Sequence, residues 1–214
     1  MSKYTKFHIG SSALITIDTQ NDFSLPGAPA EIPGTCDVLP NMALLLKWYR
    51  DHDLPIVHIV RMYLPDSSNV DLCRKELIEH GVSIAAPASD GAELVNILKP
   101  DPLLRLDSVH LLGGGVQQWS ENEAVIYKPR WGAFFKTPLE TYLKERGVDT
   151  LVFCGCNFPN CLRASIYEAS ERDFRIVLIE DAVSGLYDKG REELRNIGVE
   201  LMKTDAFLCL HIGS

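Results

Sequence analysis

The sequence predicts a single α/β domain, residues 1–214, built on an open and mostly parallel sheet with helices on both faces. Short apolar runs alternate with amphipathic stretches, as expected when strands and crossover helices follow one another. The runs are nearly continuous in apolar residues, which is typical of strands buried on both faces. The length and the 46% content of hydrophobic residues suit one domain with a full core.

Six strands are expected, each from a short run rich in Val and Ile. The runs lie at residues 13–18, 55–60, 124–127, 150–155, 175–180 and, more weakly, 199–203. Helical stretches are expected between them, at residues 37–52, 71–80, 90–98, 137–146, 161–173 and 188–197. Pro and Gly at turn spacing predict a long loop over residues 19–36, and the three glycines at 113–115 predict a turn.

The charge balance makes some classes of partner poor candidates. With 21 Lys and Arg against 29 Asp and Glu, the net charge is −8, so we expect neither nucleic acid nor an anionic membrane surface as partner. No run approaches the roughly 18 apolar residues that a membrane-spanning helix needs. The first twelve residues hold no apolar segment of a secretory signal. We therefore expect a cytoplasmic protein whose six cysteines are free thiols.

Three reactive side chains follow predicted strands. Asp18 closes the first run, Lys128 follows the 124–127 run, and Cys161 follows the loop after the 150–155 run. Carboxyl ends of parallel strands meet at one edge of a sheet, where functional groups gather. Asp18 would act as general base toward the Cys161 thiol, with Lys128 holding Asp18. Each residue alone also fits a structural role: a buried small cysteine, a loop-capping aspartate, or a solvated lysine.

Cys161 is expected in the first turn of a helix, with Asn160 as the N-cap residue. A thiol in that position feels the positive end of the helix macrodipole. The sequence therefore predicts a lowered pKa and a larger thiolate fraction for Cys161.

Three segments carry a resemblance: LITIDTQNDF, then VIYKPRWGAFFKTPLETYL, then GVDTLVFCGCNFPNCLRASIYEASERDFRIVLIEDAVS. In this order they resemble the isochorismatase-like cysteine hydrolase family, over about residues 13–185. The resemblance implies a Rossmann-like sheet and a catalytic triad of Asp18, Lys128 and Cys161. It also implies a cis peptide at Cys156–Asn157, an oxyanion hole formed by the amides of Asn157 and Cys161, and a homo-oligomer, dimer or tetramer. The loop CNFPN and a glycine at position 132, where the family often has serine, depart from the pattern.

Substrate contacts are expected next to the triad. Four aromatic residues near it in sequence could wall a small planar pocket or simply pack in the core: Phe23, Trp131, Phe134 and Phe158. Arg61 follows the second strand, and Arg130 and Arg163 flank triad residues. Any of these arginines could pair with a substrate carboxylate, although Arg163 fits a solvated helix position better.

No metal or other cofactor is expected. Cys154, Cys156 and Cys161 could supply thiolates, but Cys154 lies inside a strand and no histidine follows at zinc spacing. Nicotinamidases of the family bind a metal through an Asp-x-His motif; here only His52, Asp53 and His58 lie near that segment, and not in that pattern. The three glycines at 113–115 lack the last glycine of a dinucleotide-binding motif.

The resulting hypothesis is a hydrolase that cleaves a C–N bond of a small amide, carbamoyl or ureido compound through a cysteine thioester. One alternative is a vinyl-ether hydrolase acting on an isochorismate-like substrate. Another is a catalytically silent, partner-binding domain of the same fold.

Overall fold

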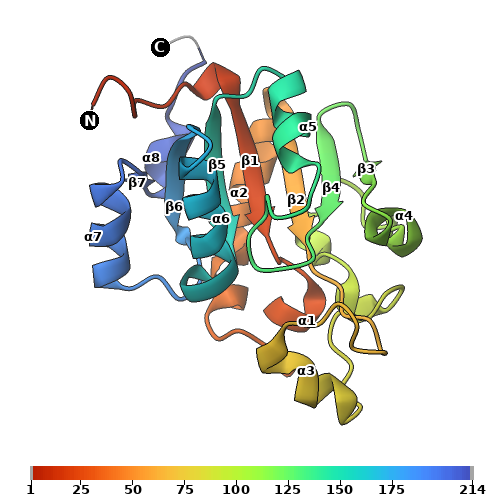
Figure 1. The fold of residues 1–214 in the computed structure, drawn as a ribbon. Coiled ribbons are helices and arrows are strands. Elements are labelled where there is room, and N and C mark those ends of the chain that lie inside the picture. The colour runs from red at the N-terminus through yellow and green to blue at the C-terminus, as the bar shows by residue number, and fades with distance from the viewer. Residues whose placement is uncertain (1, 213–214) are drawn as a thin grey trace.

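The centre of the molecule is one sheet in the strand order β3-β4-β2-β1-β5-β6-β7 (Figure 1). The structure is a computed structural model, which describes residues 2–212. The strands are β1 Ser12–Ile17, β2 Ile56–Val60, β3 Val116–Gln118, β4 Glu123–Tyr127, β5 Thr150–Gly155, β6 Arg175–Val183 and β7 Glu200–Met202. Neighbouring strands pair in parallel, except that β3 runs antiparallel to β4. The predicted open and mostly parallel α/β sheet is confirmed.

Helices cover both faces of this sheet. They are α1 Asn21–Ser24, α2 Thr35–Asp51, α3 Leu72–Glu79, α4 Ser108–Leu112, α5 Leu139–Glu145, α6 Arg163–Ser170, α7 Asp188–Asn196 and α8 Thr204–Leu208. Alternate residues of β1 point to opposite faces. Ala13, Ile15 and Ile17 pack with α5, α6 and α7, whereas Leu14 packs with α2 and α8. Within residues 2–212, no helix is both long and apolar enough to cross a membrane.

The four central strands are buried along their full lengths, which explains their nearly continuous apolar runs. Parallel strands with helices on both sides have no solvated face, so no alternation of polar residues is needed. A third apolar cluster lies under the long excursion between β2 and β4. This excursion carries α3, which lies with α1 beyond the carboxyl ends of the strands, at the bottom of Figure 1.

Three local predictions differ from the structure. The loop expected at residues 19–36 contains the short helix α1, and its last two residues already belong to α2. The sheet has a seventh strand, β3, which was not expected because three half-buried edge residues give no periodic signal. The helix expected at 90–98 is instead two 3-10 turns, Asp90–Ala92 and Asn96–Leu98. The residues between these turns are extended, and the buried Glu93 carboxylate accepts hydrogen bonds from Lys99 Nζ and the Leu106 N–H. These tertiary contacts override the helical pattern.

Candidate active site

Strand β2 positions the backbone of two of the predicted site residues. Asp18 directly follows β1, and its N–H donates to the Ile59 carbonyl at 2.9 Å. Lys128 directly follows β4, and its N–H donates to the Val60 carbonyl at 2.9 Å. Because β2 lies between β1 and β4, this continued pairing brings Asp18 and Lys128 to the same edge from both sides.

Asp18 and Lys128 form a buried ion pair, with 2.9 Å between Lys128 Nζ and Asp18 Oδ2. The Arg130 carbonyl accepts a further hydrogen bond from Lys128 Nζ at 3.3 Å. The second carboxylate oxygen, Asp18 Oδ1, is buried and has no hydrogen-bond partner among the described residues. Burial alone would lower the pKa of Lys128, but Asp18 and Cys161 raise it above its ordinary value. Lys128 is therefore a fixed positive charge, and Asp18 keeps one free acceptor.

Cys161 completes this cluster, since its thiol interacts with both Asp18 and Lys128. The predicted helix start at Cys161 is wrong. A π-helical turn, Phe158–Leu162, precedes α6 and contains Cys161. The residue before this turn is Asn157, whose side chain makes no capping bond, so Asn160 is not the N-cap.

The prediction of a lowered pKa for this thiol is also wrong. Burial and the Asp18 carboxylate raise the pKa of Cys161, Lys128 opposes both, and the net result is a pKa of about 12. Desolvation and a neighbouring negative charge outweigh the effect of a helix end. The Cys161 thiol is therefore protonated in the unliganded protein at neutral pH.

The loop between β5 and the π-helical turn supplies backbone donors. The peptide bond between Cys156 and Asn157 is cis. The Asn157 carbonyl accepts from the N–H groups of Asn160 and Leu162, at 3.3 and 3.4 Å. Among the described residues, no acceptor is found for the Asn157 N–H itself. Asn157 and Cys161 both line one cavity.

That cavity has a volume of about 150 Å³ and contains Asp18 and Cys161 in its wall. Pockets for drug-sized ligands are typically about 300–1,000 Å³, so this one fits a small compound. Three of the predicted contact residues, Phe23, Arg61 and Trp131, line it.

Phe134 and Phe158 do not line the cavity, so their prediction as pocket residues is corrected. Both are buried in the core beneath α5 and α6. Phe134 packs its ring against Phe174, and Phe158 packs edge-to-face against Tyr187. Closeness to a triad residue in sequence does not decide toward which side an aromatic side chain points. The large apolar area of each ring is buried in the core.

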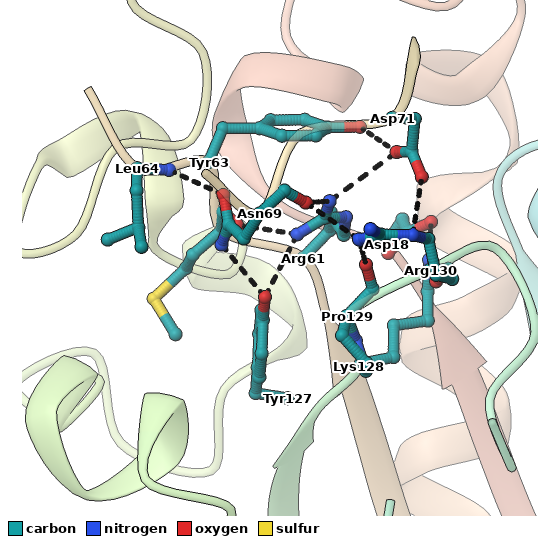
Figure 2. A network of polar contacts seen from close by, with 11 residues as sticks. Asp18, Arg61, Tyr63, Leu64, Asn69, Asp71, Tyr127, Lys128, Pro129 and Arg130 are labelled. Carbon is teal, nitrogen blue, oxygen red and sulfur yellow. Dashed lines mark hydrogen bonds and ion pairs between the residues drawn. The ribbon is translucent and has the colours of Figure 1, made fainter. Parts of the chain in front are cut away.

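Arg61 is held by a network of polar contacts, which Figure 2 shows. Arg61 Nη1 donates to the Met62 carbonyl at 2.7 Å and to the Tyr127 hydroxyl at 3.1 Å. Arg61 Nη2 donates to the Asn69 carbonyl at 2.6 Å and lies 3.4 Å from Asp71 Oδ2. Only 2% of the residue is exposed, so Arg61 is a fixed part of the cavity wall.

Arg130 and Arg163 lie outside the cavity wall. Arg130 Nη1 donates to the Asn69 carbonyl at 2.9 Å and so joins the network of Figure 2. Arg163 pairs with Glu193 at 2.9 Å and donates to the Tyr187 hydroxyl at the surface. These contacts fit the structural interpretation of Arg163.

Several cavity residues were not predicted. Tyr63, Cys73 and Arg74 come from the excursion after β2, and Asn160 comes from the π-helical turn.

Gln20, within the segment TQNDF, connects the loops after β1 and β2. Its Nε2 donates to the Arg61 and Ala92 carbonyls, and its Oε1 accepts from the Arg61 N–H. The available signal in the sequence was an uncharged polar residue, Gln20, two positions after Asp18.

The histidines considered as metal ligands lie elsewhere. His58 is fully buried, with Nδ1 2.8 Å from Thr16 Oγ1 and Nε2 2.8 Å from Glu123 Oε1. His52 stacks on Trp48 with 4.1 Å between ring centroids. Among residues 2–212, no group of three or more His, Cys, Asp or Glu side chains is arranged to hold a metal ion.

A family model described as the isochorismatase domain matches residues 12–206. The chain belongs to the isochorismatase family. An isochorismatase family protein of Desulfovibrio vulgaris has a similar structure, with a TM-score of 0.79, 31% sequence identity, and coverage of 92% of this chain and 96% of that one.

Two curated relatives from the isochorismatase family have names that differ in the activity they state. One, from Arabidopsis thaliana, is named a probable inactive nicotinamidase; it is 28% identical over 196 residues, covering 89% of this chain and 91% of the relative. The other is the maleamate amidohydrolase of Pseudomonas putida, 28% identical over 181 residues, covering 84% of this chain and 75% of the relative. Amidohydrolases are thus among the relatives of this chain.

Proposed function

We propose that this chain is a cysteine hydrolase that cleaves the C–N bond of a small amide, carbamoyl or ureido compound. The observation that carries the proposal is that the two carboxylate oxygens of Asp18 have different surroundings. Its Oδ2 is held by Lys128, and its Oδ1 is a buried acceptor with no partner among the described residues. The same carboxylate interacts with the Cys161 thiol. A base positioned in this way beside a protonated nucleophile suits acyl transfer. The similarity to maleamate amidohydrolase supports the same class of reaction.

In the proposed first half-reaction, Asp18 Oδ1 takes the thiol proton as Cys161 Sγ bonds to the substrate carbonyl carbon. The negative charge that forms on the carbonyl oxygen is stabilised by the amides of Asn157 and Cys161. Collapse breaks the C–N bond, and the leaving nitrogen takes the proton from Asp18. The products of this half-reaction are an amine or ammonia and a thioester on Cys161.

In the second half-reaction, Asp18 removes a proton from water as the water oxygen attacks the thioester carbonyl. The C–S bond breaks, the acid leaves, and the proton on Asp18 returns to the Cys161 sulfur. The sum is amide plus water giving acid plus amine, and the protein is regenerated. Lys128 keeps Asp18 in place and its positive charge near the reacting groups throughout.

The test is a panel of small amides, ureas and carbamoyl acids, scored for ammonia release. We expect turnover of at least one compound by the wild-type protein, and a loss of roughly 10³-fold or more in Cys161→Ala. Cys209→Ala, at an exposed thiol, is the matched control. Mass spectrometry of a quenched reaction should find the acyl group on Cys161.

The panel also separates the rival functions. A silent domain, for which the inactive relative is a precedent, would release no ammonia from any compound. A vinyl-ether hydrolase would turn over only an isochorismate-like compound and would tolerate Cys161→Ala. Either result would contradict the proposed amide hydrolysis.

A further inference from the structure

The charges around the cavity do not balance. Among the described residues, Asp18 is the one acidic residue in its wall, and the charge of Asp18 is compensated by Lys128. Two arginines also line the cavity: Arg61, which has Asp71 nearby, and Arg74 on α3, which has no carboxylate partner among the described residues. The wall therefore carries an excess of positive charge in an otherwise acidic protein.

Arg74 is held in position without using its hydrogen-bond donors. Its guanidinium carbon lies 5.9 Å from the ring centroid of Phe23 and 5.8 Å from that of Tyr63. Both rings line the same cavity. No hydrogen bond or ion pair of this guanidinium is found within residues 2–212. A half-buried arginine that is packed by aromatic rings and keeps its fork of N–H groups free is suited to bind a planar anion.

Arg61 supplies a second, independent sign of a ligand. It is 2% exposed, and its Nε is buried and lacks a hydrogen-bond partner among the described residues, although both of its terminal nitrogens are bonded. Buried polar groups are nearly always paired in folded proteins, so an unpaired donor in a cavity wall calls for an acceptor. A ligand oxygen would supply it.

We propose that Arg74, together with Arg61 Nε, binds a carboxylate of the substrate while its amide or ureido carbonyl lies at Cys161. This inference rests on the proposed hydrolase function and narrows it to a class of substrate: small acids that carry the scissile group and a carboxylate in one molecule. The carboxylate accepts a bidentate pair of hydrogen bonds from Arg74, and the volume of about 150 Å³ restricts the spacer between the two groups to a few atoms.

The kinetic test compares acids with their uncharged counterparts. Maleamate and N-carbamoylglycine are each assayed beside their methyl esters, which keep the scissile group, remove the negative charge and add one methyl group. We expect the wild type to prefer an acid over its ester by about 10- to 100-fold in kcat/KM, as for a hydrogen-bonded ion pair. Arg74→Met should remove this preference, mainly through KM, and Arg74→Lys should restore part of it.

Lys75→Met is the matched control, because Lys75 is the next residue of α3 and pairs with Glu79 at the surface. It should leave the kinetics of acid and ester unchanged. Equal kcat/KM for acid and ester in the wild type, or equal losses in Arg74→Met and Lys75→Met, would overturn the carboxylate subsite.

A binding experiment separates this inference from the proposed function. Calorimetry measures the affinity of Cys161→Ala protein for maleate and for inorganic phosphate, with and without Arg74→Met. Maleate binding that requires Arg74 supports the subsite even if no amide is hydrolysed. Turnover of amides without maleate binding overturns the subsite and keeps the hydrolase. Phosphate binding that is tighter than maleate binding would overturn the assignment to a carboxylate.

Discussion

Gly155 packs directly against the backbone of Ile17, its partner in the β1–β5 ladder. A Cβ atom built on Gly155 would lie 2.6 Å from the Ile17 nitrogen and still closer to the Ile17 carbonyl oxygen. Gly155 also has a φ of +122°, which residues with a side chain rarely adopt. The close approach lets the end of β5 lie beside the end of β1. The loop that carries Cys161 therefore starts beside Asp18.

Gly155→Ala should lower the free energy of unfolding by roughly 3 kcal/mol or more, because it adds a backbone clash to the strain of a positive φ. Gly81→Ala is the control: Gly81 has a φ of +88°, but a Cβ there would meet no atom within 4 Å. It should show only the conformational strain, about 1–2 kcal/mol. Urea unfolding measures both variants. Equal losses would mean that the contact with Ile17 is unimportant.

Asp18→Asn and Lys128→Met should each reduce kcat by at least about 100-fold, since one removes the base and the other its buried partner. In the double variant the loss should be far smaller than the product of the two single losses, because groups that act as one unit are not additive. Lys128→Met should also lower the melting temperature more than the double variant does, since it leaves a buried carboxylate unpaired. Multiplicative losses in kcat would show that the two groups act independently.

The raised pKa of Cys161, about 12, gives a pH dependence of alkylation. Iodoacetamide should react slowly with Cys161 at pH 7, about ten times faster for each pH unit up to pH 10, because only the thiolate reacts. Asp18 raises this pKa and Lys128 lowers it. Asp18→Asn should therefore accelerate the reaction at pH 8, and Lys128→Met should slow it. Peptide mass spectrometry follows Cys161 alone, and shifts of the same sign in both variants would contradict this electrostatic account.

Glu123 should contribute to stability in a pH-dependent way. Burial would raise its pKa, but hydrogen bonds from Arg50 and His58 lower it to about 2. Because the pKa is lower in the folded protein, the stabilisation is present above the unfolded pKa of about 4.5 and is lost as the pH falls toward 2. Glu123→Gln should thus be strongly destabilising at pH 7 and much less so at pH 3. A pH-independent difference in urea unfolding would contradict this.

Activity should not depend on a metal ion. The carboxylate of Asp18 is already neutralised by Lys128. The two candidate histidines near β2 do not converge, because His58 is buried against Thr16 and Glu123 and His52 is stacked on Trp48. Dialysis against a chelator should leave both turnover and melting temperature unchanged. Elemental analysis that finds a stoichiometric metal whose removal abolishes turnover would overturn this prediction.

The sequence was most informative where regular structure fixes position. Asp18 and Lys128 follow strongly apolar runs, and parallel pairing brings the ends of such strands to one edge, so their neighbourhood could be predicted. Arg74 and Tyr63 could not be assigned to the cavity, because they lie in a long excursion whose path is set by tertiary contacts. The direction of the Cys161 pKa shift was wrong for a similar reason. It depends on burial, which the position of a helix end does not reveal.

The order of the strands has a consequence for when the folding chain completes its candidate active site. Asp18, Lys128 and Cys161 are widely separated along the chain, yet they meet only when β4, β2, β1 and β5 are all in register. Contacts between such distant segments form slowly during folding, because large loops must close first. The ability to bind a ligand at the cavity should therefore appear late in folding. A nascent chain that has not yet released residues 150–161 from the ribosome cannot contain the complete cluster.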